Sequence, residues 1–102
     1  MLKSDVIADI YFYETEKNGR KEPTCASQFG CIFIIDNKKY ECRLLLNEIG
    51  SIYPGENKKN IPIKFLSFKS VFENLKIGEK FYLWDMRNIA EGTIREIRKN
   101  GN

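Results

Sequence analysis

The amino-acid sequence predicts an all-β fold of six short strands, in the form of a small barrel or sandwich. Apolar residues recur at every second position in several short stretches, which is the side-chain period of a strand with one buried face. Clusters of glycine, proline, asparagine and aspartate separate these stretches and mark turns. With 102 residues, the chain has the length of one self-sufficient domain, which we take to span 1–102.

The first predicted strand covers residues 6–13 and leads into a long polar loop. Its mixed face bears Tyr11 and Tyr13. Its apolar face consists of Val6, Ala8, Ile10 and Phe12. Residues 14–28 are polar and contain a turn signal at Asn18-Gly19. This loop is long for a barrel connection, and long ordered loops are often functional.

A central hairpin is predicted over residues 29–46. Residues 29–35 are almost all apolar and rich in β-branched and aromatic types, which favours a buried strand. Residues 36–39 form the predicted turn. The returning strand places alternate residues on one face, namely Tyr40, Cys42, Leu44 and Leu46. Cys31 and Cys42 read as small buried side chains that can face each other across this hairpin.

The fourth strand follows a predicted turn at Pro54-Gly55. Proline fixes the first central φ of a type II turn, and glycine accepts the positive φ of the second. Ile61, Ile63 and Phe65 then share one face of the strand. Pro62 has no N–H for a ladder hydrogen bond, so its nitrogen must point away from a partner strand or lie at an edge.

Residues 68–77 are predicted to form a short helical turn or an irregular crossing between strands. Ser70 offers a weak N-cap for it, and Gly78 ends the segment. A fifth strand follows, in which Phe81 and Leu83 face the core.

Residues 85–88 turn the chain into the sixth strand, residues 89–97. The apolar phase of this strand shifts between Ile94 and Ile97, as a bulge of one residue would cause. We expect residues 99–102 to be a frayed tail.

Composition favours a soluble globular protein. No apolar run approaches the roughly 20 residues of a membrane span, and the first residues lack the apolar stretch of a signal peptide. We therefore expect a cytoplasmic protein without a membrane partner. Three cysteines at scattered spacing do not predict a disulfide framework. The net charge is +3, and the lysine excess between residues 56 and 69 either keeps turns and edges soluble or meets nucleic acid or an acidic protein.

The sequence shows no recognisable catalytic arrangement. The chain has no histidine, which removes the commonest general base and the commonest zinc ligand. The cysteines lack C-x-x-C spacing, and no glycine-rich loop ends in the lysine and hydroxyl pair that binds phosphate. We therefore predict no catalytic residues, no metal, no cofactor and no bound nucleotide, and hence a protein that is not an enzyme.

The order of several motifs resembles a known domain. The motifs are Asn18-Gly19-Arg20-Lys21-Glu22-Pro23, Ser27-Gln28-Phe29, Tyr53-Pro54-Gly55-Glu56-Asn57 and the strand from Ile61 to Leu66. In this order and approximate spacing, the chain resembles the C-terminal β-barrel domain of elongation factor Tu from about Asp5 to Arg98. The resemblance implies a six-stranded antiparallel barrel. In that family, the domain packs on a GTPase domain and helps to grip the T-arm of aminoacyl-tRNA.

The same resemblance implies candidate contacts to RNA. Gln28 stands where the family has a glutamine near the tRNA, and Asp85 stands where it has a tRNA-facing glutamate. Arg20 keeps the arginine of the first long loop. With the basic residues of the loops, the candidate RNA-binding set is Arg20, Lys21, Gln28, Lys38, Lys39 and Asp85.

A second candidate surface is aromatic. The outward phases of the first and fifth strands carry Tyr11, Tyr13, Tyr82 and Trp84. If these strands are neighbours, the four rings form one patch. Together with Arg87 in the following turn, such a patch suits a protein interface or base stacking. In the alternative, the rings cover a thin barrel or pack beneath residues 68–77.

These observations lead us to expect a non-catalytic protein-binding module. One concrete form is an immunity protein, which neutralises a toxin by covering its active site. The alternative is an RNA-binding barrel related to translation. Charge distribution discriminates between the two: basic residues gathered on one face with Gln28 favour RNA, whereas a contiguous aromatic patch with dispersed lysines favours a protein partner.

Overall fold

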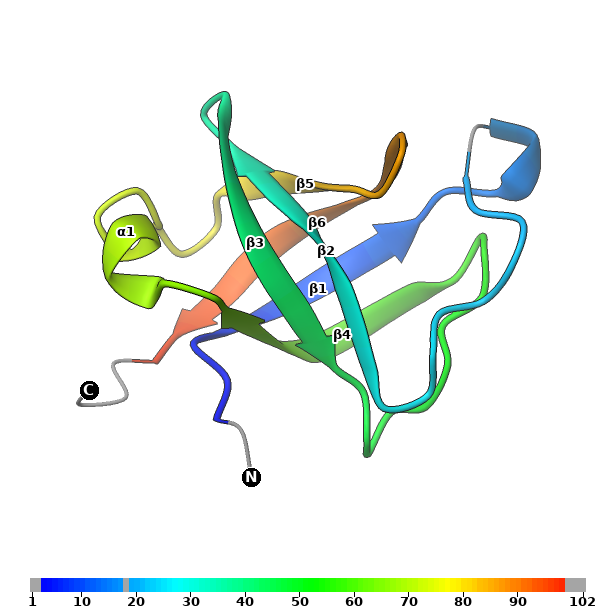
Figure 1. The fold of residues 1–102 in the computed structure, drawn as a ribbon, viewed down its shortest axis with the longest axis horizontal. Helices are drawn as coiled ribbons and strands as arrows, with labels where there is room; N and C mark the ends of the chain where they lie inside the picture. Colours follow the sequence, from blue (N-terminus) through cyan, green and yellow to red (C-terminus); the bar gives the residue numbers. More distant parts are fainter. Residues whose placement is uncertain (1–2, 18, 99–102) are drawn as a thin grey trace.

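Six strands close into an antiparallel barrel in the computed structural model, which describes residues 3–17 and 19–98 (Figure 1). The strand order around the barrel is β1-β4-β3-β2-β5-β6, which confirms the predicted six-stranded antiparallel barrel. The strands are β1 (Val6–Phe12), β2 (Gln28–Ile35), β3 (Lys38–Leu45), β4 (Asn57–Phe65), β5 (Lys80–Trp84) and β6 (Asn88–Ile97). Two short helical elements accompany them, η1 (Thr15–Lys17) and α1 (Phe68–Phe72). The predicted frayed tail, residues 99–102, lies outside the described residues.

The core fills the barrel because the apolar faces predicted from the period-two pattern point inward. At its centre, the ring of Phe33 stacks on Phe81 with centroids 4.3 Å apart and meets Phe65 edge-on at 4.9 Å. All three rings are at most 2% exposed, and burying rings of this size stabilises the fold strongly. The alternate residues of each strand therefore form the outer surface, where a site made by strand side chains must lie.

The β2–β3 hairpin turns more tightly than predicted. Asp36 and Asn37 alone form the turn, and both have a positive φ, 49° and 62°. Aspartate and asparagine tolerate this conformation, and a two-residue turn of this kind matches the twist of the paired strands. The prediction of a four-residue turn was therefore wrong: Lys38 and Lys39 are the first residues of β3.

The turn before β4 is confirmed at Pro54-Gly55. Gly55 has a φ of 88°, and the N–H of Glu56 donates to the carbonyl of Tyr53 over 3.1 Å. Pro62 lies inside β4, but the pairing of β4 with β3 runs only from Ile63 to Phe65. Pro62 thus lies just outside the stretch of β4 that pairs with β3, where a backbone N–H would be needed for a ladder hydrogen bond.

The segment after β4 contains the short helix α1. It begins after Ser67, so the prediction of Ser70 as N-cap was wrong. The Ser70 hydroxyl lies inside the helix, 3.1 Å from that of Ser67. Val71 is buried against the barrel, and Gly78, with a φ of 89°, ends the segment as predicted.

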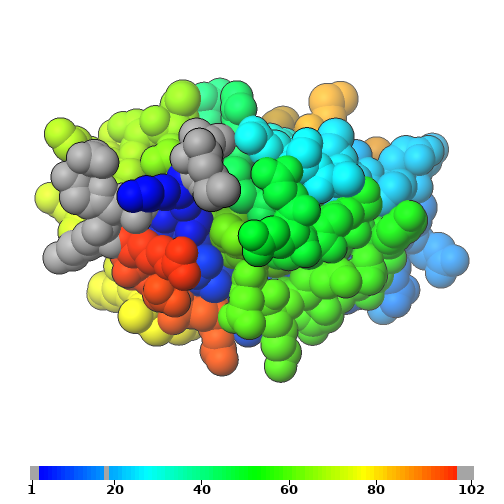
Figure 2. Space-filling model, turned by 90° about the horizontal axis from the view of Figure 1, so that it is seen from below, coloured from blue at the N-terminus to red at the C-terminus, as the bar shows by residue number. Residues whose placement is uncertain are grey.

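The last strand closes the barrel against the first, with Val6 beside Ile97 (Figure 2). The register between these strands shifts because Ile7 pairs with Glu96 whereas Ala8 pairs with Ile94. One residue of β6 is therefore unpaired, which confirms the predicted bulge between Ile94 and Ile97.

Candidate functional site

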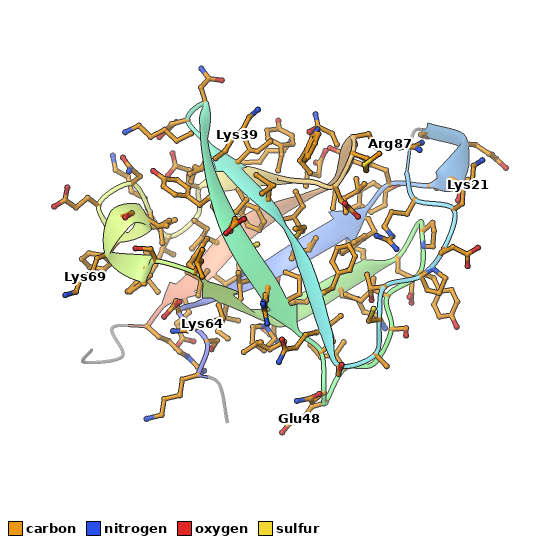
Figure 3. All side chains as sticks on the ribbon, viewed as in Figure 1. Lys21, Lys39, Glu48, Lys64, Lys69 and Arg87 are labelled. Carbon is orange, nitrogen blue, oxygen red and sulfur yellow. The ribbon has the colours of Figure 1, made fainter. Side chains whose placement is uncertain are left out.

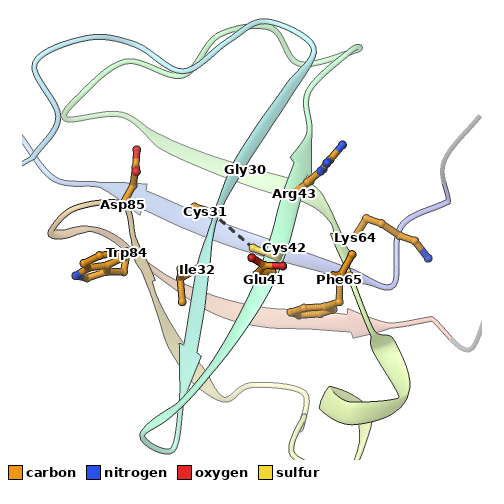
Figure 4. A pocket seen from close by; sticks show the side chains of 11 residues that line it. Gly30, Cys31, Ile32, Glu41, Cys42, Arg43, Lys64, Phe65, Trp84 and Asp85 are labelled. Carbon is orange, nitrogen blue, oxygen red and sulfur yellow. Dashed lines mark hydrogen bonds between the residues drawn. The ribbon is translucent and has the colours of Figure 1, made fainter.

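A groove of about 530 Å³ crosses the outer face of the barrel from β5 over β2 and β3 to β4 (Figure 4). Two short strand pairings lie beneath it. β2 pairs with β5 only from Ile32 to Ile34, and β3 pairs with β4 only from Cys42 to Leu44. The outward residues that define the groove are Gly30, Ile32, Glu41, Arg43, Leu66 and Trp84.

Each side of the groove carries an exposed apolar side chain. Trp84 projects outward from the end of β5, and its register partner on β2 is Ile32. The indole is 41% exposed, and Leu66 on the opposite side is 78% exposed. Gly30 has no side chain to separate these walls, so the floor between them is the main chain of β2. A solvent-exposed tryptophan beside such a hollow is the kind of anchor that dominates protein interfaces.

The charged residues of the groove fall into two classes. Two of them have partners outside the groove: Lys64 lies 3.4 Å from the buried carboxylate of Asp5, and Asp85 lies 3.0 Å from Arg20. Arg43 donates to the neutral amide oxygen of Gln28 over 3.1 Å. Within the described part of the chain, neither Arg43 nor Glu41 forms an ion pair.

The turn after Trp84 holds a strained and exposed residue. Met86 has a φ of 68° and is 83% exposed. The turn is tight, because the N–H of Asp85 donates to the carbonyl of Arg87 over 2.9 Å. A positive φ is uncommon for a residue with a Cβ, and such strain concentrates at functional sites. Arg87 is exposed beside it.

The three tyrosines of the predicted aromatic surface gather elsewhere, around Glu91. Tyr11 and Tyr82 are its register partners on the two neighbouring strands. The hydroxyl of Tyr13 donates to Glu91 Oε1 over 3.1 Å, and Lys80 Nζ lies 3.1 Å from Oε2. We call these five residues the tyrosine cluster.

The members of the tyrosine cluster contact one another. Lys80 Nζ also lies 5.4 Å from the centre of the Tyr82 ring, and Tyr11 meets Tyr13 edge-on at 5.8 Å. Burial, and then the hydrogen bond to Glu91, raise the pKa of Tyr13 from 10.0 to about 12. The phenol therefore stays a neutral donor to this carboxylate.

A single patch of four rings was expected only if β1 and β5 were neighbours, and that condition is not met. β6 lies between them. As a result, Tyr11, Tyr13 and Tyr82 form one cluster, while Trp84 belongs to the groove. The alternative, in which Trp84 packs beneath residues 68–77, is wrong, because the indole is exposed and lines the groove.

The residues of the candidate RNA-binding set are spread over the barrel. Arg20 is held by Asp85, by the carbonyl of Glu22 at 3.2 Å, and by the Phe29 ring, whose centre is 4.6 Å from its guanidinium carbon. These contacts fasten the long loop to β2 and to the β5–β6 turn. Arg20 and Asp85 are thus brought together, but as partners of each other.

Three further members of that set lie at opposite ends of the β2–β3 hairpin. Gln28 begins β2, while Lys38 and Lys39 follow the turn at its far end, roughly 23 Å away at the usual rise per residue. Lys38 donates to Asn74 over 3.3 Å. Figure 3 shows Lys39 at the hairpin and Lys21 in the long loop, on separate parts of the molecule.

Cys31 and Cys42 face each other across the hairpin, as predicted, with their sulfurs 3.7 Å apart. Both are buried and free. The mutual hydrogen bond, and then burial, raise the pKa of Cys42 well above its ordinary value. The pair packs beneath the groove, with Cys42 as a neutral thiol.

Sequence reasoning missed most of the groove, namely Gly30, Ile32, Glu41, Arg43 and Leu66, and it missed Met86 in the turn beside the groove. One signal for it was present: Gly30 interrupts an otherwise continuous apolar strand, and an isolated glycine there indicates a bulge or a close backbone approach. Groups of three or more His, Cys, Asp or Glu side chains that could hold a metal are absent from the described residues.

No protein-family model matches the sequence, and no curated protein matches it significantly. Over the described ranges, no helix has the length and apolar character needed to cross a bilayer.

Proposed function

We propose that this protein is a non-catalytic protein-binding module whose contact surface is the groove together with Trp84, Met86 and Arg87. The observation that carries the proposal is the turn after β5. Two residues after an exposed tryptophan, it holds a methionine in a strained backbone conformation with 83% of its surface exposed. An exposed indole and an exposed, strained methionine both suit a surface that is covered in a complex.

The form of the proposal that we favour is an inhibitor, such as an immunity protein that covers the active site of its partner. The net charge of +3 bears on the kind of partner. An inhibitor that imitates a nucleic acid would be acidic, so this chain does not fit that class. A partner with a neutral or acidic surface around an apolar contact agrees better with the charge. Kinship with the elongation factor Tu barrel and a cytoplasmic location are parts of the same proposal.

The alternative, RNA binding related to translation, has weaker support. Arg20 and Gln28 already bind Asp85 and Arg43, and the lysine pair of the hairpin lies at the far end of β2. An RNA site needs several free cations along one track. If RNA is nevertheless the partner, its affinity should fall steeply with salt and be lost when Lys38 and Lys39 are both replaced by glutamate.

Position-specific photo-crosslinking tests the proposal. A benzophenone amino acid at Met86 should trap one protein in the cells from which the chain comes. The same probe at Lys76, an exposed residue outside the groove and its turn, is the matched control. Loss of the Met86 crosslink on adding Trp84→Ala would support the proposed surface. Equal trapping from both positions, or a crosslink indifferent to Trp84→Ala, would refute it.

A further inference from the structure

Gly30 is the one glycine among the described residues that the fold itself does not explain. Three others have a positive φ, Gly50, Gly55 and Gly78. At Gly92 an added Cβ would lie 2.4 Å from the Phe81 ring, and at Gly19 it would overlap a main-chain carbonyl. At Gly30, by contrast, φ is ordinary and a Cβ would meet no atom within 4 Å.

A glycine in mid-strand weakens the strand, because it has more conformational freedom to lose and no side chain to pack. A strand glycine that neither φ nor crowding requires marks a bulge, a bend of the barrel, or a close approach by a ligand or another backbone, and the unbroken β2–β3 register excludes a bulge at Gly30. Gly30 lies on the floor of the groove, between Trp84 and Arg43. The approaching group therefore has to come from outside the barrel.

The strand around Gly30 has an open side. β2 pairs with β3 along its whole length, from Gln28 to Ile35, but with β5 only from Ile32 to Ile34. Residues 28–31 consequently have a neighbouring strand on one side alone. On the β5 side their main chain has no strand partner, so the floor of the groove at Gly30 is exposed backbone.

The charges of the groove specify the chemistry of such a segment. Arg43 lies directly opposite Lys64 on β4, and like charges in this arrangement repel. Asp5 neutralises Lys64, which leaves the Arg43 guanidinium without a carboxylate within the described residues. Glu41, two residues earlier on the same face of β3, also has no ion pair there. The groove thus offers one unmatched cation and one unmatched anion.

The spacing of these two charges equals the period of an extended chain. Residues two apart on a strand lie about 7 Å apart, and so do alternate side chains of a segment lying along it. A segment whose acidic residue contacts Arg43 therefore brings the residue two positions along next to Glu41, where a basic side chain fits. The reverse orientation sets like charges against each other.

We propose that the groove holds an extended segment of the partner protein, with its main chain over Gly30, an acidic side chain on Arg43, a basic side chain two positions along on Glu41, and an apolar side chain against Trp84. This deepens the proposed function and rests on it. The partner is thereby identified by its chemistry, as a chain with an exposed, extended and locally charge-alternating segment.

A phage-displayed library of random dodecapeptides, selected on the whole protein, tests this proposal, and selected peptides are then synthesised and measured by calorimetry. They should carry an acidic and a basic residue two positions apart, next to an apolar residue. Gly30→Leu, which fills the floor, should weaken them at least tenfold. Arg43→Glu should do the same, whereas Lys39→Glu, the same charge reversal on the same strand outside the groove, should leave their affinity unchanged.

Gly30→Ala is the control for variants that lose binding only because they fail to fold. It should melt at the same or a higher temperature than the wild type while weakening the peptides several-fold. A lower melting temperature would mean that the fold needs this glycine, and the proposal would fall. It would also fall if no peptide were enriched, or if the peptides bound Gly30→Leu as well as the wild type. Should Gly30→Leu keep the Met86 crosslink while Trp84→Ala loses it, the extended segment is refuted and the protein-binding function stands.

Discussion

The tyrosine cluster and the groove are both built on outward side chains of β5, yet they differ in how their polar groups are matched. In the cluster, Glu91 takes a hydrogen bond from Tyr13 and an ion pair from Lys80, and the rings pack on one another. In the groove, Arg43 and Glu41 lack ion pairs within the described residues, and the floor at Gly30 is empty. Exposed rings alone therefore do not identify a binding surface. The cluster and the groove differ in whether the charged side chains beside the rings have partners.

The largest expected effect contrasts two glycines of the sheet. Gly92→Ala should lower the free energy of unfolding by about 2 kcal/mol, because the added methyl overpacks the Phe81 ring and the Asp9 carbonyl. Gly30→Ala should raise it by about 0.5 kcal/mol, since the strand gains rigidity in open space. Urea denaturation of both variants measures the contrast. Equal losses would show that Gly30 is structural as well.

The next prediction concerns Arg20, and it distinguishes a structural role of this residue from a contact with RNA. Arg20→Ala should cost about 1 kcal/mol of stability, from the ring contact with Phe29 and the partly exposed ion pair with Asp85. Thermal denaturation gives the loss, and hydrogen exchange should quicken in residues 19–27. Arg87→Ala, at an exposed arginine with no such contacts, is the control. An Arg20→Ala protein as stable as the wild type would return this residue to the candidates for RNA binding.

A smaller effect of opposite sign is expected in the turn beside the groove. Met86→Gly should stabilise the protein by about 0.5 kcal/mol, since relief of roughly 1 to 2 kcal/mol of left-handed strain outweighs the extra chain entropy of glycine. Little packing is lost, because Met86 is 83% exposed. Chemical denaturation checks the change. Destabilisation would mean that the side chain serves the fold, contrary to its proposed role in binding.

An effect that is confined to high pH lies in the tyrosine cluster. The pKa of Tyr13 rises from 10.0 to about 12 on folding, so the unfolded chain loses this proton first as pH increases. The contribution is complete below pH 10, and stability should fall as pH rises from about 10 to 12. Tyr13→Phe should remove this part of the decline, whereas Tyr53→Phe, at an exposed tyrosine, should not. Identical pH profiles for Tyr13→Phe and the wild type would contradict the account of the cluster.

The strands and their inward faces were predictable because period-two patterning is a local property. The bulge in β6 was readable for the same reason, from the phase shift before Ile97. The turn at Asp36-Asn37 was predicted two residues too long, because the charged Lys38 and Lys39 were taken as turn residues although they begin β3. Ser70 was misread as an N-cap because a serine pattern does not fix the first residue of so short a helix.

The site depended on contacts that the sequence does not encode locally. Placing β6 between β1 and β5 is a consequence of barrel closure, and it separated Trp84 from the tyrosines. Arg20 and Asp85 are 65 residues apart in the chain, so their pairing was invisible. Gly30 could be noticed in the sequence, but only the empty space around its missing side chain makes it informative.

The most direct test compares two rings on the same strand and face, Trp84 and Tyr82, which are 41% and 37% exposed. The measurement is the affinity of Trp84→Ala and Tyr82→Ala for the protein trapped by the Met86 crosslinker. Our account predicts that Trp84→Ala weakens binding by about 2 kcal/mol or more with little change in melting temperature, while Tyr82→Ala leaves the affinity nearly unchanged. Equal losses for both variants, or a large fall in melting temperature for Trp84→Ala with no loss of affinity, would contradict it.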